Sequence, residues 1–144
     1  MAEAVLRSQC DAAGLAVQVD SAGTSAAHEG EGADVRALRV LRAAGYPLQH
    51  RARQIRPEWL TQRDLVLVMD RANLRGVRAL AERSGAAHSH VRLLREFDPV
   101  AVAEGDIEVP DPWYGGPQGF ADVLDMVESA GRGVVEHLRV QTGP

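Results

Sequence analysis

The sequence lacks several features that would mark particular classes of protein. Its 144 residues include one cysteine, aromatic residues make up 4%, and the net charge is −4. The single cysteine, Cys10, excludes an internal disulfide, so we expect a reducing, cytoplasmic location. The acidic balance argues against nucleic-acid binding, which needs a basic stripe. No apolar run is long enough to span a membrane, and the first residues do not resemble a signal peptide.

What is present suits one soluble domain over residues 1–144. The hydrophobic share is 45% and the charged share 25%, both ordinary for a globular protein of this length. Every one of the 16 basic residues is arginine. Arginine can bind phosphate with two parallel hydrogen bonds, but a general coding bias toward arginine explains the pattern better. Composition therefore sets the class of protein and leaves its chemistry open.

Helical and strand patterns alternate along the chain. The patterns predict helices over 1–13, 34–44, 71–83 and 118–140, a helical turn from Pro57, strands over 17–23, 64–70 and 91–97, and loops over 24–32 and 98–117. Asp34 and Asp70 stand at N-cap positions, and Gly14 and Gly45 stand just past two helix ends. The inner stripe of the final helix consists of Phe120, Val123, Leu124, Val127 and Val134.

This alternation predicts an α/β fold with three αβα layers around a parallel sheet. The apolar run of residues 65–69 is typical of a strand that is buried on both faces. Such folds usually open on a strand, and the ligand lies where that strand meets its helix. Because this chain opens on a helix, we expect that the first strand of the sheet is missing.

Seven stretches together are similar to the low-molecular-weight protein tyrosine phosphatases. The D-S-A-G-T segment from Asp20 and the D-P-W-Y-G-G segment from Asp111 are the most specific. The stretches follow the family's order and spacing over nearly the whole chain, and they are MAEAVLR, VDSAGTS, ADVRALRVLRAAGY, HRARQ, LVLVMDRANL, VRLLREFDP and VPDPWYGGPQGFADVLDMVESA. The resemblance implies a four-stranded parallel sheet and no metal or cofactor.

The family's catalytic loop, Cys-x5-Arg-Ser-Pro, would stand directly before Met1 and is not in this sequence. Cys10 does not replace the catalytic cysteine, since Ala16 occupies the arginine position and Cys10 falls inside a predicted helix. We interpret Cys10 as a small packed residue. A reactive cysteine needs a thiolate, which a loop of backbone N–H groups stabilises. The resemblance thus predicts a domain that is truncated at its N-terminus.

The resemblance assigns roles to four residues of the remaining site. Asp111 corresponds to the general acid that protonates the leaving phenolate and later activates water. Trp113 and Tyr114 correspond to aromatic residues that stack on the substrate ring, although the family usually has two tyrosines there. Ser21 corresponds to a serine that orients the catalytic loop. From the sequence alone, a serine that ends a strand before a glycine turn is an equally good interpretation.

Histidines elsewhere have simpler interpretations than a metal site. His28 falls in the family's variable specificity loop, and an exposed loop residue is the better interpretation. His50 and Arg53 match the H-x-A-R-Q stretch, and we expect them to anchor a loop. His88 and His90 flank one serine without cysteines or clustered carboxylates, which favours a polar loop over a metal site.

Three functional hypotheses remain open. The first is a monomeric tyrosine phosphatase that acts on phosphotyrosine proteins or small aryl phosphates through a cysteinyl-phosphate, with its loop encoded upstream of Met1. The second is an inactive pseudophosphatase that only binds its ligand. The third is an arsenate reductase, which is disfavoured because that chemistry uses further cysteines. Under each hypothesis the 144-residue chain itself lacks a nucleophile and is expected to be inactive.

Overall fold

The structure is a computed structural model, and it describes residues 1–23, 34–47, 53–112 and 117–142. The helices are α1 (Ala2–Ala12), α2 (Val35–Ala43), α3 (Trp59–Gln62), α4 (Arg71–Ser84), α5 (Pro99–Glu104) and α6 (Pro117–Thr142). The strands are β1 (Val66–Val68) and β2 (Val91–Leu93), and a 3-10 helix, η1 (Leu94–Phe97), follows β2.

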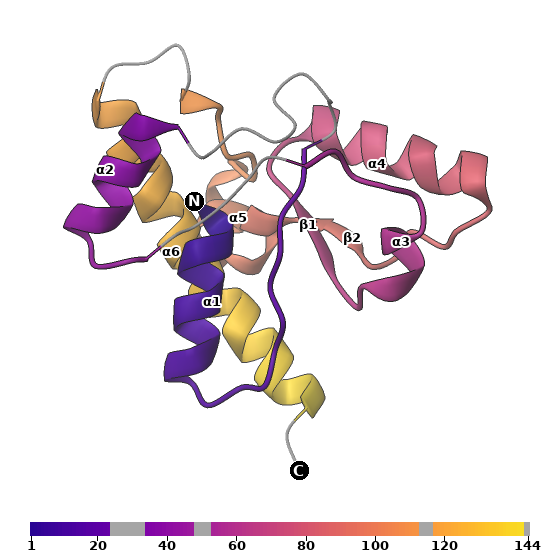
Figure 1. Ribbon diagram of the computed structural model, residues 1–144, viewed down its shortest axis with the longest axis horizontal. Coiled ribbons are helices and arrows are strands. Elements are labelled where there is room, and N and C mark those ends of the chain that lie inside the picture. The colour runs from indigo at the N-terminus through magenta and orange to yellow at the C-terminus, as the bar shows by residue number, and fades with distance from the viewer. Residues whose placement is uncertain (24–33, 48–52, 113–116, 143–144) are drawn as a thin grey trace.

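Strands β1 and β2 run parallel, with Val66 opposite Val91 and Val68 opposite Leu93. Helix α4 connects the two strands, as a parallel pair requires. Figure 1 shows this β1–α4–β2 unit on one side of the molecule and α1, α2 and α6 on the other. The predicted α/β class and its parallel sheet are therefore confirmed, with a two-stranded sheet in the described part of the chain.

Helices cover both faces of β1 because its side chains alternate between two hydrophobic clusters. Leu65, Leu67 and Met69 pack against the larger cluster, which α1, α2 and α6 build with contributions from η1 and Val109. Val68 belongs to the smaller cluster, together with buried residues of α3, α4 and β2. This alternation follows from the period of two in a strand. A thin sheet thereby joins two helical layers.

Helix ends follow the predicted signals closely. The Asp34 carboxylate accepts the Arg36 N–H at 2.8 Å, and the Asp70 carboxylate accepts the Asn73 N–H at 2.8 Å. Gly14 has a φ of +71° directly after α1, a conformation that glycine adopts without steric cost. The inner stripe predicted for the last helix is buried in α6, with exposures from 1% to 6%. These four predictions are confirmed.

The strand predicted over residues 17–23 does not form. In the described part of the chain, Gly23 alone makes a bridge, with Gln54, and residues 18–20 have no backbone hydrogen bond to a neighbouring strand. Figure 1 shows this segment running beside β1 without joining its sheet. The sequence pattern is typical of a strand, but a strand also needs a partner at about 4.8 Å. The prediction was wrong, because among the described residues nothing pairs with the backbone of residues 18–20.

The strand predicted over residues 64–70 is shorter and less buried than expected. Only Val66–Val68 form β1, and within the predicted run only Val68 is buried, while Leu65 and Leu67 are half-buried. Among the described residues β1 pairs with β2 alone, so its other edge lacks the covering that a central strand receives.

The chain after Val91 departs from the prediction twice. The strand predicted over residues 91–97 ends at Leu93, where the Glu96 carboxylate accepts the Leu93 N–H at 3.2 Å and turns the chain into η1. The predicted loop over residues 98–117 contains α5. The Asp98 carboxylate accepts the Val100 N–H at 3.0 Å to cap this helix, and Gly105 ends it. Prolines favour a loop over this stretch, but a proline that directly follows a capping Asp also starts helices.

Candidate active site

The segment of residues 15–23 is fastened to α1 by two side-chain hydrogen bonds. The Ser21 hydroxyl donates to a Glu3 carboxylate oxygen at 2.9 Å, and the Arg7 guanidinium donates to the Val19 carbonyl at 2.6 Å. Glu3 is buried at 9% exposure, and its other carboxylate oxygen lies 3.6 Å from Arg7. A buried carboxylate requires such partners. Ser21 therefore lies beside the first turn of α1.

A cluster of Asp20, Arg53, Trp59 and Arg63 holds the other side of this segment. The Asp20 carboxylate accepts from Arg63 Nε at 3.1 Å and from Arg53 at 3.3 Å. The two guanidinium groups lie 4.9 and 5.6 Å from the centre of the Trp59 ring. Hydrogen bonding to Arg63 is the main cause that lowers the pKa of Asp20 below its ordinary value. Arg53 also donates to the Ser21 carbonyl at 3.0 Å, which supports its predicted anchoring role.

Asp111 lies on a segment that is tied to the end of β1. The Val109 N–H donates to the Met69 carbonyl at 2.7 Å, one residue beyond β1, and Val109 is buried at 3% exposure. Asp111 follows two residues later with an exposed side chain. Pro112 packs near Gly119 in the first turns of α6. Two anchors thus present the Asp111 carboxylate at the surface.

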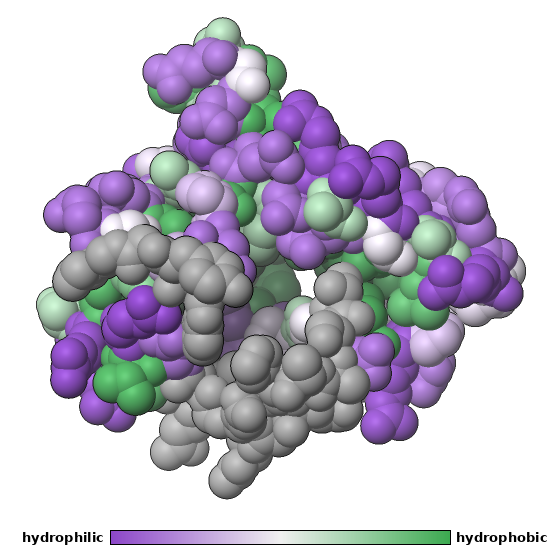
Figure 2. Space-filling model, turned by 90° about the horizontal axis from the view of Figure 1, so that it is seen from above, coloured by the Kyte–Doolittle hydropathy of each residue, from purple (hydrophilic) through white to green (hydrophobic). Residues whose placement is uncertain are grey.

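The first turn of α1, the Ser21 segment and the Asp111 segment all border the larger hydrophobic cluster. Met1, Val19 and Met69 pack against it, and Val109 is part of it. The carboxyl ends of parallel strands share one edge of a sheet, where α/β folds bind ligands. Figure 2 views the molecule from above, with hydrophilic side chains around the rim and apolar atoms between them. The three segments thus share the larger hydrophobic cluster as their support.

The surroundings of Cys10 do not favour a nucleophilic thiolate. Its side chain is 1% exposed within α1, as its interpretation as a packed residue predicted. Burial raises the pKa of the Cys10 thiol, and the charge of Asp11 acts in the same direction. A raised pKa keeps the sulfur protonated at neutral pH, while nucleophilic attack requires the thiolate. Cys10 therefore cannot serve as the reacting thiol of this site.

The description "Low molecular weight phosphotyrosine protein phosphatase" belongs to a family model that matches residues 1–142. The chain belongs to this family. Family membership and named relatives make it a protein-tyrosine-phosphatase enzyme by descent. The match spans both hydrophobic clusters and every element described above.

Relatives with this name occur in several bacteria. The low molecular weight protein-tyrosine-phosphatase of Streptomyces coelicolor is 51% identical over 98% of this chain and 86% of its own length. The low molecular weight protein-tyrosine phosphatase A of Mycobacterium tuberculosis is 41% identical over 100% of this chain and 88% of its own length. A crystal structure of a protein tyrosine phosphatase from Entamoeba histolytica superimposes with a TM-score of 0.84 at 27% identity, covering 99% of this chain and 88% of that one.

Several of the predicted residues contact neither Ser21 nor Asp111, or lie outside the described residues. Trp113, Tyr114, His28 and His50 lie outside the described residues, as does the predicted loop over 24–32. His90 Nε2 lies 2.7 Å from the Leu60 carbonyl, whereas His88 lies 3.5 Å from the Glu82 carboxylate. The two histidines thus contact different elements.

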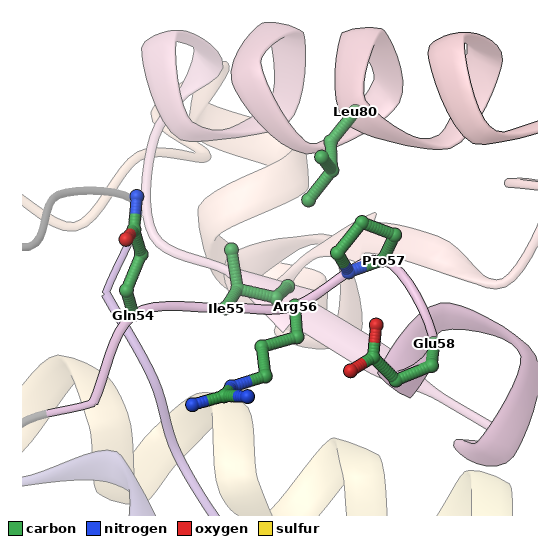
Figure 3. A pocket seen from close by; sticks show the side chains of 6 residues that line it. All are labelled: Gln54, Ile55, Arg56, Pro57, Glu58 and Leu80. Carbon is green, nitrogen blue, oxygen red and sulfur yellow. The ribbon is translucent and has the colours of Figure 1, made fainter.

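A shallow pocket lies between residues 54–58 and α4. In Figure 3, Leu80 points from α4 toward Ile55 and Pro57, and Arg56 points away from them. None of the residues that line this pocket carries the predicted chemistry.

Sequence patterns do not predict the residues that hold the Ser21 and Asp111 segments in place. Glu3, Arg63 and Arg95 were not singled out, although each bonds a segment of the site. For Arg95 no local signal stands out, because Arg92 and Glu96 are charged neighbours in the same stretch. For Glu3 and Arg63 the partners are 18 and 43 positions away, so local pattern could not pair them.

Proposed function

We propose that this protein hydrolyses phosphotyrosine esters in the reducing cytoplasm, as a monomer, with residues 1–144 forming part of one phosphatase domain. The observation that carries the proposal is the anchored Asp111 segment. Its Val109 N–H is bonded at 2.7 Å to the Met69 carbonyl at the end of β1, where the family places its general acid. Asp111, Trp113 and Tyr114 would contact the substrate, and Ser21 would position the phosphate-binding loop.

The proposed chemistry has two displacement steps. A cysteine thiolate attacks the phosphorus, the bond from phosphorus to the tyrosine oxygen breaks, and the Asp111 carboxyl gives its proton to the leaving oxygen. A water then attacks the phosphocysteine, and the Asp111 carboxylate takes the proton of that water. Inorganic phosphate and the thiolate are released. No metal is required by these steps.

We propose further that the thiolate comes from a Cys-x5-Arg loop and a preceding strand that are not among these 144 residues. Two observations support this. Cys10 is buried with a raised pKa, and both residues 18–20 and the outer edge of β1 lack backbone partners in the described residues. One strand laid between them would satisfy both edges, because each strand pairs on two sides.

The test compares two purified proteins on a phosphotyrosine peptide. One is the 144-residue chain, and the other carries a strand and a Cys-x5-Arg-Ser-Pro loop, taken from the Streptomyces relative, ahead of Met1. We expect turnover only from the second protein, and we expect Asp111→Asn to lower its kcat/KM by about 100-fold or more. Turnover by the shorter chain that survives Cys10→Ser would overturn the proposal.

The same assay separates the binding-module hypothesis. A pseudophosphatase would bind the phosphotyrosine peptide without turnover in both proteins, and calorimetry would detect that binding. Mass spectrometry of the N-terminal peptide of the native protein then decides which of the two forms exists in the cell. Arsenate-dependent turnover by the longer protein would support the third hypothesis instead.

A further inference from the structure

Arg95 is the only buried arginine among the described residues, and nothing in the proposed chemistry uses it. Its residue exposure is 7%, in the 3-10 helix η1. Taking a guanidinium out of water costs several kcal/mol unless all its donors find partners. Arg95 does not meet that condition, because its Nε is buried without a partner in the described part of the chain. Burial of Arg95 with an unpaired Nε therefore lowers the stability of the fold, so stability alone does not explain its presence.

The bonds that Arg95 does make converge on one segment. Its Nη1 donates to the Glu108 carbonyl at 2.9 Å and lies 3.2 Å from an Asp106 carboxylate oxygen. Asp106 and Glu108 directly precede buried Val109, and Asp111 follows two residues later. Arg95 therefore holds the root of the segment that presents Asp111.

Glu108 continues this contact toward α4. Its carboxylate accepts the Arg71 N–H at 2.7 Å and faces the Arg71 guanidinium at 3.2 Å. Together with the bond from Val109 to Met69, three partner residues, Arg95, Arg71 and Met69, hold residues 106–109. The Arg71 pair is exposed and therefore weak. The Arg95 side chain, by contrast, is only 9% exposed where it donates to the Glu108 carbonyl, although its Asp106 partner is 64% exposed.

We infer that Arg95 is a positioning residue for the general acid, because it fixes the backbone of residues 106–109 from which Asp111 projects. This inference rests on the proposed function of Asp111. A carboxyl that must protonate a leaving oxygen has to lie within hydrogen-bond reach of it. A misplacement of about 1 Å in such a group can cost about 100-fold in rate. The orphaned Nε is consistent with a residue kept for geometry rather than for stability.

The test uses the catalytically competent protein and two substrates that differ in their need for an acid. A phosphotyrosine peptide releases a basic phenolate, whereas nitrophenyl phosphate releases a weakly basic one that needs little protonation. For Arg95→Met we expect kcat/KM to fall about tenfold on the peptide and less than about twofold on nitrophenyl phosphate. A purely structural residue would lower both values by the same factor.

Three variants make the result decisive. Arg92→Met is the matched control, because Arg92 bonds Glu96 within the same stretch and does not contact residues 106–109; both substrates should be unaffected. Arg95→Lys keeps a charge and should restore part of the selective loss, and it replaces Arg95→Met if that variant does not fold. Asp111→Asn shows whether the substrate pair reports general-acid catalysis in this protein.

The outcomes separate the inference from the proposed function. Equal losses on both substrates with Asp111→Asn would remove Asp111 from its role, and the proposed function would fail with it. A selective loss with Asp111→Asn but equal losses with the Arg95 variants would overturn the inference alone. Hydrogen exchange gives a second readout without turnover: the Val109 amide should exchange faster in Arg95→Met and stay unchanged in Arg92→Met.

Discussion

Residues 17–20 and residues 65–69 have similar strand-like sequences, yet they are held in different ways. The second stretch forms β1, which pairs with β2 through its backbone and packs on both hydrophobic clusters. The first stretch has no backbone ladder in the described residues; side chains of Arg7 and Arg63 hold it, and Val19 packs against the larger cluster. Backbone pairing and a packed core resist solvent conditions, whereas exposed ion pairs are weakened by salt and acid.

This difference predicts that different substitutions and solvent conditions destabilise the two regions. The packed region around β2, η1 and α6 should respond strongly to changes in side-chain volume. The segment of residues 15–23 should respond to charge and pH and little to volume. Both statements can be tested by substitutions at sites where the structure fixes the expected direction.

The largest effect is expected at Gly133, where α6 crosses η1. A Cβ atom added there would lie 1.7 Å from the Phe97 carbonyl oxygen and 2.7 Å from its carbonyl carbon. Because both atoms belong to the backbone, the helix and η1 would have to separate. Gly133→Ala should lower the free energy of unfolding by about 3 kcal/mol, the upper part of the usual range for overpacking. Urea unfolding followed by circular dichroism measures it.

Two other glycines of α6 serve as graded controls. At Gly131 an added Cβ would meet the Gln9 side chain, whose Oε1 lies 2.1 Å away and can move, so a smaller loss is expected. At Gly119 the nearest atom is the Pro112 Cβ at 3.7 Å, an ordinary contact. Since alanine favours helix over glycine by up to about 1 kcal/mol, Gly119→Ala should not destabilise. Equal losses at all three positions would contradict the close packing of α6 on η1.

Sequence predicted most of the packed region because its signals are local. The stripe from Phe120 to Val134 has the helical period, and Asp34 and Asp70 each cap a helix within three residues. The loop predicted over residues 98–117 was wrong at Asp98, because an Asp-Pro pair can begin either a loop or a helix. Its outcome as the cap of α5 depends on the N–H groups of Val100 and Ala101, which no local pattern distinguishes from a turn.

The candidate site was less predictable for a different reason. Asp111 and Ser21 were found through resemblance, whereas the residues that hold them act over long separations in sequence. Glu3 meets Ser21 and Arg95 meets Glu108 only after the helices have packed. The pattern of residues 17–23 is typical of a strand, but the predicted strand was wrong because a strand forms only beside a neighbouring strand.

An intermediate effect is expected at Tyr46, which links the end of α2 to α6. Its hydroxyl donates to a Glu128 carboxylate oxygen at 2.6 Å, and this bond, followed by burial, raises the pKa of Tyr46 to about 12. A raised pKa stabilises the fold below the ordinary value of about 10, and this contribution is lost as pH rises from there toward 12.

We therefore expect one late-titrating tyrosine in an ultraviolet absorbance titration, and Tyr46→Phe should remove it. The same variant should lose about 0.5 to 1.5 kcal/mol of stability at neutral pH, the usual net contribution of a hydrogen bond, since Tyr46 is only half-buried. Tyr114→Phe is the matched control. A titration in which both tyrosines ionise near pH 10 would exclude a strong bond to Glu128.

The smallest effect is expected at Asp20, and it tests the segment held by side chains. The bonds from Arg63 and Arg53 lower the pKa of Asp20, so the folded state binds a proton less readily than the unfolded chain. The resulting stability is present above the ordinary pKa of an aspartate and is lost as pH falls through the lowered value in the folded state. Because both pairs are exposed at the rim, Asp20→Asn should cost only about 0.2 to 1 kcal/mol at neutral pH and low salt.

The loss in Asp20→Asn should shrink in 1 M salt, where charges are screened within about 3 Å. Amide exchange at residues 18–22 should become faster in this variant, while that of β1 stays constant. Asp11→Asn is the control, since this exposed carboxylate lies on the far end of α1 from the cluster. Faster exchange in β1 as well would mean that the segment and the sheet form one cooperative unit, and the contrast between them would not hold.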